Sequence, residues 1–386
     1  MAVNGYLVID ADAHYLEPIR EIAEYIEEPW RSRLLGSDPA KYLPLGLGDR
    51  MLAGRIRRDD MDYGYGYGTG DPKQVRGTMA NIGIDASVLV PNRIITLGHV
   101  TIRDLVVALN AGFVRYMIDR VCDPAAGVYT MVVACWQDPR AAAELIDEVG
   151  GDPSIAGVCM MTAGANPPLG DPAYDPIYAA AERNDLPMVF HSAPGLNHVE
   201  GADYASFQRL IESHSVGFAI SNLIQTTSMI LQGIPERFPN LKFVFQESGL
   251  FWVPMVQYRL DEYVMKRRSE APLLKRLPSE YIRDQFYFGT QPIEVPKDQH
   301  HLETVFEAAD GYRHFIFCSD YPHFDYDDPS AILRLGFLSR EQKADVLAGN
   351  ALRVFQLRKK GGTQPWESIG SDGSTSSPST AATSSS

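Results

Sequence analysis

The sequence predicts an α/β fold, a (β/α)8 TIM-like barrel, and three observations support this prediction. Eight short apolar runs recur along the 386 residues, and an amphipathic segment follows nearly every one. The runs are continuously apolar, which is typical of parallel strands covered by helices on both faces. No glycine-rich phosphate-binding turn follows the first run, although the main alternative, a doubly wound open sheet, would favour one. A closed barrel is the simplest arrangement of this pattern.

The expected elements follow one another along the chain. The first strand lies within "VIDADAHYLEP", and the other seven are expected at 86–91, 128–134, 155–161, 186–191, 241–247, 286–290 and 314–320. Helical patterns lie near 101–121, in "PRAAAELIDEVG" and "YDPIYAAAERND", near 217–236, in "WVPMVQYRLDEYV" and near 301–309. Further helices are expected after the eighth run, one of them with a capping box formed by Ser339 and Gln342.

Two segments depart from this pattern. Residues from about 35 to 80 contain "MDYGYGYGTGDPK" without clear periodicity. This predicts a long loop insertion after the first strand, either a surface loop or a cover for the site. The tail from Gly361 is rich in Ser and Thr, so we expect it to be disordered. The predicted domains are the barrel over 1–360 and a disordered tail over 361–386.

Composition and charge narrow the class of partner. A net charge of −14 argues against nucleic acid and against anionic membrane surfaces, and no apolar stretch of about 18 residues suits a membrane span. The four cysteines lie far apart without a CxxC, which is typical of reduced core residues. No signal peptide is evident, so we expect a cytoplasmic protein. The expected partner is a small-molecule substrate, and a homo-oligomer is left open.

Polar residues end four of the eight expected strands. The first strand ends with Asp12 and His14, the fifth with His191, the sixth with Glu247 and the eighth with Asp320. In a barrel, the C-terminal ends of the strands carry the chemistry. A buried carboxylate is costly there unless something positive lies beside it. The sequence therefore predicts that these five side chains meet around a metal ion.

The donor set indicates which metal to expect. Two imidazoles and three carboxylates favour iron or manganese over zinc, so we expect Fe(II), with Mn or Zn as alternatives. The set is large for one ion, and a second ion bridged by Glu247 is a hypothesis. His323, three residues after Asp320, is a candidate general acid, second-ion ligand or orienting partner. Glu17 is a candidate for orienting a ligand. Asp10 alternates with Asp12 and is expected on the same strand face.

The ordered motifs "DADAHYLEP", "GIDASVLVPN", "LPMVFHSAPG", "QESGLFWVPMVQYRLDE", "TQPIEVP" and "FCSDYPHFD" carry a resemblance. The chain resembles the amidohydrolase-related family, which includes aminocarboxymuconate-semialdehyde decarboxylase and the resorcylate-type decarboxylases, over roughly residues 6 to 357. The resemblance implies a metal-dependent barrel with ligands on strands one, five, six and eight.

The chain departs from this family in three places. Many members begin with His-x-His, but Asp12 and His14 form Asp-x-His here. Many members place histidine at the end of strand six, where this chain has Glu247. Binuclear members often bridge their ions with a lysine or glutamate on strand four, and "GVCMMTAG" offers neither. These departures move the expected site away from zinc hydrolysis and toward iron or manganese.

Three reaction classes fit this site, with Asp320, His323 and Glu247 as the expected catalytic residues. A hydrolase would use Asp320 to take a proton. A decarboxylase would anchor a substrate carboxylate on the metal, with His323 or His191 transferring the proton. An oxygenase would use two ferrous ions. The last is preferred, because the ligand set is similar to that of dinuclear non-heme iron monooxygenases of platensimycin-type biosynthesis. The preferred substrate is a sizeable, partly apolar small molecule, and a non-catalytic metal-binding partner protein is the second alternative.

Overall fold

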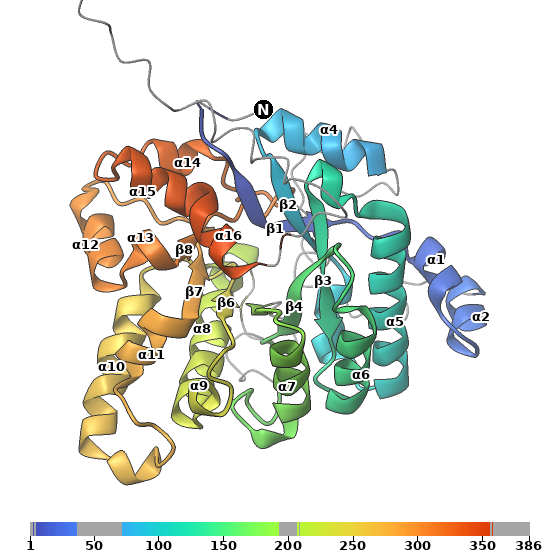
Figure 1. Ribbon diagram of the computed structural model, residues 1–386, viewed down its shortest axis with the longest axis horizontal. Helices are drawn as coiled ribbons and strands as arrows, with labels where there is room; N and C mark the ends of the chain where they lie inside the picture. Colours follow the sequence, from blue (N-terminus) through green and yellow to red (C-terminus); the bar gives the residue numbers. More distant parts are fainter. Residues whose placement is uncertain are drawn as a thin grey trace, which may run out of the picture.

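A computed structural model describes residues 3, 5–36, 72–192, 207, 209–355 and 357, which form a single barrel (Figure 1). Eight parallel strands pair in chain order within one sheet. The strands are β1 Ile9–Tyr15, β2 Ala86–Pro91, β3 Val128–Ala134, β4 Ile155–Met161, β5 Met188–His191, β6 Phe243–Phe245, β7 Phe286–Gly289 and β8 Phe315–Ile316. The predicted (β/α)8 barrel is confirmed.

Backbone hydrogen bonds join the end of the barrel to its beginning. The N–H of Ala11 donates to the carbonyl of Phe317 at 3.1 Å, and the N–H of His14 donates to the carbonyl of Tyr321 at 2.8 Å. A parallel bridge also pairs Ala13 with Tyr321. The segment after β8 therefore lies beside β1, although almost the whole length of the barrel separates them in sequence.

Helices surround the barrel, and most of them cover its outside. They are α1 Ile19–Ile22, α2 Trp30–Leu35, α4 Pro72–Ile82, α5 Arg103–Tyr116, α6 Pro139–Val149, α7 Asp175–Arg183, α8 Leu210–Leu231, α9 Ile234–Arg237, α10 Trp252–Lys266, α11 Pro278–Gln285, α12 His300–Ala308, α13 Gly311–His314, α14 Ser330–Leu333, α15 Arg340–Ala344 and α16 Asn350–Val354. The predicted capping box is present on α15. The Ser339 hydroxyl accepts the N–H of Gln342 at 3.2 Å, and the Gln342 side chain accepts the N–H of Ser339 at 2.8 Å.

Apolar side chains fill both sides of the sheet, as the continuous apolar runs predict. Between sheet and helices, the rings of Phe190 and Phe245 stack with their centroids 4.8 Å apart. Ile9, Val88 and Val244 belong to a second buried cluster, formed mainly by alternate strand residues. A sheet that is apolar on both faces leaves the strand ends as the place where polar side chains can gather.

The strands before two predicted ligands are shorter than expected. β6 ends at Phe245 and β8 at Ile316, so Glu247 and Asp320 lie in the turns that follow these strands. Beyond β8 the backbone leaves the extended conformation at Asp320, whose φ is 58°, although its N–H still donates to the carbonyl of Asp12 in β1 at 2.8 Å. These ligand positions are set by turns as well as by the sheet.

Two helices also differ from the sequence prediction. α8 begins at Leu210, earlier than expected. α4 occupies part of the segment that was expected to lack regular structure. Val75 and Met79, one helical turn apart, are both buried there, and their packing stabilises the helix. The rest of the predicted insertion, 37–71, and the predicted disordered tail lie outside the described residues.

The four cysteines are free thiols, and three of them are buried, in agreement with the predicted reduced core residues. Within the described ranges, no helix combines the length and the apolar character that a bilayer crossing requires.

Candidate metal centre

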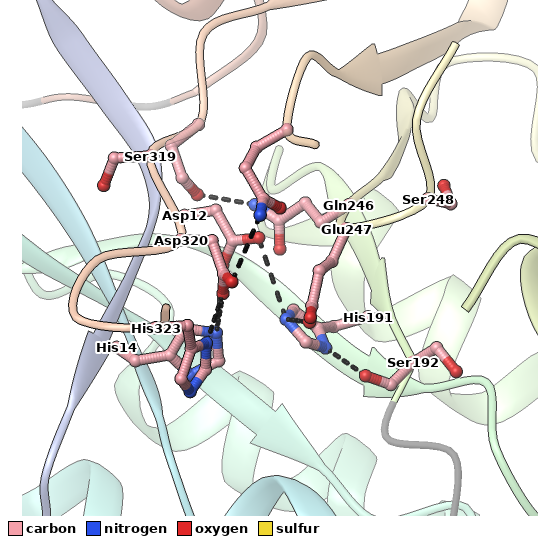
Figure 2. A network of polar contacts seen from close by, with 12 residues as sticks. Asp12, His14, His191, Ser192, Gln246, Glu247, Ser248, Ser319, Asp320 and His323 are labelled. Carbon is pink, nitrogen blue, oxygen red and sulfur yellow. Dashed lines mark hydrogen bonds and ion pairs between the residues drawn. The ribbon is translucent and has the colours of Figure 1, made fainter. Parts of the chain in front are cut away.

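Strand β1 supplies two side chains to the site, Asp12 and His14 (Figure 2). Nδ1 of His14 lies 3.3 Å from the carbonyl oxygen of Pro91. Because a carbonyl oxygen only accepts hydrogen bonds, this contact places a proton on Nδ1. Nε2 of His14 then faces the carboxylates, 3.8 Å from Oδ1 of Asp12 and 3.0 Å from Oδ1 of Asp320.

His191, the last residue of β5, is held in the same way. Its Nδ1 donates to the carbonyl of Ser192 at 2.6 Å. Its Nε2 lies 3.1 Å from Oε2 of Glu247 and 3.7 Å from Oδ2 of Asp12. Both imidazoles therefore use Nδ1 to bond backbone carbonyls and direct Nε2 at carboxylate oxygens. A backbone bond at the other ring nitrogen commonly orients a metal-ligating histidine.

Asp320 and Glu247 both lie in turns with left-handed backbone, at φ 58° and φ 50°. Burial alone would raise the pKa of Asp320. His323 as a nearby positive charge, with hydrogen bonds from His14 and His323, outweighs this effect and holds the pKa well below its usual range. Asp320 is therefore a carboxylate at neutral pH, available as an anionic ligand.

Asp10 is buried behind these residues. Its carboxyl accepts the N–H of Ser319 at 2.8 Å, the Ser319 hydroxyl at 2.5 Å and the N–H of Asp12 at 3.1 Å. Burial raises the pKa of Asp10 to about 7. The register with β2 shifts between Asp10 and Ala13, which breaks the strict alternation expected for this strand. Asp10 therefore bonds to the backbone beside two ligands and does not join their cluster.

His323 lies between a ligand and the loop after β2. Its Nδ1 is 2.6 Å from Oδ1 of Asp320, and its Nε2 is 2.9 Å from Oδ1 of Asn92. The turn that carries Asn92 is fixed by Glu17, whose carboxylate accepts the backbone N–H groups of Asn92, Arg93 and Ile94 at 3.0, 2.6 and 2.5 Å. Glu17 thus orients a ligand through Asn92 and His323, one step further out than expected.

Gln291, just after β7, holds the other oxygen of Asp320. Its Nε2 lies 3.3 Å from Oδ2 of Asp320 and 3.2 Å from the carbonyl of Asp325. Both partners are acceptors, so this amide nitrogen is the donor. Asn92 and Gln291 each directly follow a strand-end residue, Pro91 or Thr290, that offers no ligand. Reading one residue further along each predicted strand would have found them.

The structure brings all five predicted ligands into one buried cluster. Two groups have ligand atoms close enough to share an ion: Asp12, His14, His191 and Asp320, and separately Glu247, Asp320 and His323. Asp320, rather than Glu247, is common to both groups. An imidazole Nε2 and a carboxylate oxygen about 3 Å apart attract each other only when a proton or a cation lies between them. Mixed nitrogen and oxygen donors of this kind fit a divalent metal ion.

Comparisons with known proteins agree with this geometry. Residues 9–357 match the amidohydrolase family. An amidohydrolase from Mycobacterium avium subsp. paratuberculosis is 20% identical, with a TM-score of 0.71 and 92% of this chain and 100% of that chain covered. The 5-carboxyvanillate decarboxylase LigW from Sphingomonas paucimobilis is 22% identical, with a TM-score of 0.61 and 91% and 99% covered.

A third solved structure has bound metal. It is a mutant of the 5-carboxyvanillate decarboxylase LigW2 from Novosphingobium aromaticivorans, with manganese and 3-methoxy-4-hydroxy-5-nitrobenzoic acid. It is 17% identical, with a TM-score of 0.66 and 90% of this chain and 96% of that chain covered. No curated protein sequence matches the chain. The family match over nearly the whole barrel and the buried donor cluster lead to one conclusion: the chain belongs to the amidohydrolase family and is a metal-dependent enzyme.

Proposed function

We propose that this protein is a divalent-metal-dependent, non-oxidative decarboxylase that acts on a small carboxylic acid. The observation that carries the proposal is the buried group of Asp12, His14, His191 and Asp320 at the barrel mouth, with His323 hydrogen-bonded to Asp320. Two of the similar structures are named as decarboxylases, which supports this reaction over the others of the family. They give no support to the monooxygenase preferred from sequence, so the decarboxylase alternative replaces it.

In the proposed mechanism, Asp12, His14, His191 and Asp320 hold the ion. When bound, the ion would supply Lewis-acid anchoring of the substrate carboxylate. The protein must then deliver a proton to the carbon that loses CO₂. We assign this proton to Nδ1 of His323, which lies 2.6 Å from Oδ1 of Asp320. General acids positioned in this way contribute about 10²–10⁴-fold to a rate.

The proposal assigns one ion to each chain. His323 has a polar partner at both ring nitrogens, Asp320 on Nδ1 and Asn92 on Nε2, so it is better placed to carry a proton than to bind a second ion. Manganese is the proposed ion, because carboxylate-rich sites suit it and because a similar structure is named with manganese. Metal analysis after loading is expected to give one equivalent of Mn²⁺, and two equivalents in fully active protein would contradict this assignment.

The reaction class is tested by loading metal-depleted protein with Mn²⁺ without oxygen and supplying hydroxylated benzoates and other unsaturated carboxylates. We expect CO₂ release at the same rate with and without O₂, and no O₂ uptake. His191→Ala, which removes a ligand nitrogen, is the negative control. Substrate-dependent O₂ consumption would support the monooxygenase instead. A product that has gained water without losing CO₂ would support a hydrolase.

Asn92 offers a test of how His323 is held. Asn92→Ala removes the acceptor at Nε2 but leaves the backbone N–H groups that Glu17 binds. We expect kcat to fall by about 10–100-fold, the usual cost of removing a partner that orients a site residue, while bound Mn²⁺ stays at one equivalent. Asn92→Gln, which keeps an amide, should recover part of this loss. Unchanged kcat in Asn92→Ala would show that His323 does not depend on this contact.

A further inference from the structure

Helix α8 carries a fully buried asparagine, Asn222, near its middle. Asparagine is a weak helix former, and a buried amide is costly unless it is hydrogen-bonded. Both ends of this amide have partners on the barrel. Its Nδ2 donates to the carbonyl of Gln246 at 2.8 Å and to the hydroxyl oxygen of Ser248 at 3.1 Å. Its Oδ1 accepts the hydroxyl of Thr162 at 2.9 Å, so tertiary contacts explain the asparagine at this position.

The partners of this amide lie at the ends of three neighbouring strands. The first two flank Glu247 in the turn after β6. The third, Thr162, directly follows β4, and its backbone N–H donates to the carbonyl of His191 at the end of β5 at 3.0 Å. Asn222 is therefore bonded on both sides of Glu247 and is linked through one residue to a predicted metal ligand.

The turn that Asn222 contacts has a strained backbone. Glu247 has a φ of 50°, which residues with a side chain rarely adopt. Such a conformation persists only where the surrounding structure over-determines it, and it is found mainly at functional sites. A further contact holds this turn against β1, since Nε2 of Gln246 donates to the carbonyl of Ala11 at 2.5 Å. The two bonds from Asn222 fix the peptide groups on either side of the strained residue.

The strained backbone directs the carboxylate of Glu247 toward His191 (Figure 2). Oε2 of Glu247 lies 3.1 Å from Nε2 of His191, and both side chains are almost fully buried. A buried negative charge beside this ligand nitrogen favours a cation there, because charges interact strongly where water is excluded. If the turn relaxed, the carboxylate would move away from the nitrogen and the cation would lose this attraction.

We propose that Asn222 is a positioning residue of the metal centre. It stabilises the strained turn that holds Glu247 beside His191, and in this way it raises the affinity of the site for its divalent ion. Partners that orient the groups around a metal commonly change its affinity by about 10–100-fold when they are removed. The inference rests on the proposed ion, but not on the reaction that the ion assists.

Titration with Mn²⁺ tests this role without a substrate. The signal of the free ion in electron paramagnetic resonance reports how much Mn²⁺ the full-length, metal-depleted protein binds. Asn222→Ala should raise the dissociation constant by about tenfold or more. The substitution also removes buried hydrogen bonds, so the midpoint of urea denaturation should fall as well.

Asn350→Ala is the matched control. Asn350 is also fully buried, and its Nδ2 donates to the carbonyls of Tyr312 and Phe315 at 3.1 and 2.6 Å. Phe315 begins β8, so this asparagine lies at the end of the barrel opposite the metal centre. Asn350→Ala should lower the urea midpoint as Asn222→Ala does, but it should leave the dissociation constant for Mn²⁺ unchanged.

A double variant shows whether Asn222 acts through Glu247. Glu247→Gln removes the charge that the turn is proposed to hold in place. In this background, Asn222→Ala should raise the dissociation constant by less than about twofold, because the two substitutions remove one and the same effect. A general loosening of the barrel predicts the same rise in both backgrounds. Ser248→Ala, which removes one acceptor of the amide, repeats the comparison if Asn222→Ala does not fold.

The outcomes separate this inference from the proposed function. Equal affinity for Mn²⁺ in the wild type and in the folded variants at the amide would overturn the role of Asn222, and so would an equal loss with and without Glu247→Gln. Bound Mn²⁺ without CO₂ release would contradict the proposed reaction and leave this role intact. A wild-type protein that binds no Mn²⁺ would overturn both.

Discussion

Asp320→Asn is expected to reduce the rate of metal-dependent turnover by about 10³-fold while leaving the barrel folded. The substitution removes the negative charge that His14 and His323 approach at 3.0 and 2.6 Å. Both the ion and the position of the proposed acid depend on that carboxylate. Asparagine tolerates the left-handed backbone of this position, at φ 58°, so the turn itself should persist.

Turnover, bound Mn²⁺ and thermal unfolding should be measured on the same preparation. Asp310→Asn is the matched control, because Asp310 also has a left-handed backbone, at φ 49°, and lies at the start of α13. It should keep wild-type turnover and metal content. If Asp320→Asn also retained full metal content and turnover, the assignment of this carboxylate to the site would be wrong.

Asp10→Ala is expected to lower the free energy of unfolding by about 3 kcal/mol or more, although Asp10 is not a proposed ligand. The substitution leaves three buried donors without their acceptor: the N–H of Ser319, the hydroxyl of Ser319 and the N–H of Asp12. Two of these belong to the backbone beside Asp12 and Asp320. The affinity for Mn²⁺ should therefore fall by about 10–100-fold as well, because the ligands lose their alignment.

Two milder variants show whether the hydrogen bonds are responsible. Ser319→Ala removes only the hydroxyl and should cost about 1 kcal/mol. Asp10→Asn keeps a polar group of the same shape and should lie between Ser319→Ala and Asp10→Ala. Urea denaturation and Mn²⁺ titration measure the two effects separately. A loss below about 1 kcal/mol in Asp10→Ala would show that these contacts stabilise the barrel little.

The sequence predicted the barrel and the place of the ligands for the same physical reason. Continuous apolar runs identify strands buried on both faces, and a charged residue at the end of such a run stands out against them. Asp12, His14, His191, Glu247 and Asp320 were found in this way. Asn92 and Gln291, which act on ligands through tertiary contacts, are uncharged and did not stand out in this way. Asp10 was expected only to share a strand face with Asp12, and the register shift between Asp10 and Ala13 could not be read from the alternating pattern.

The reaction was the least predictable part. Because Glu247 stands where many family members have histidine, the sequence interpretation favoured iron and an oxygenase. Residue types reveal the metal ligands but not the reaction. The choice between one and two ions depends instead on which atoms His323 contacts. That required the positions of Asn92 and Asp320, which lie far apart in the chain and meet only in the folded barrel.

The hydrogen bonds between β1 and the turn after β8 have a consequence for how the enzyme matures. The backbone N–H of Asp320 reaches the carbonyl of Asp12 only when the first and last strands have met. A chain emerging from the ribosome therefore cannot complete the site until its final strand has been made. Closing so long a loop is entropically costly, and binding an ion to the finished site offsets part of that cost. The supply of the proposed ion is therefore expected to affect the yield of mature protein as well as its turnover.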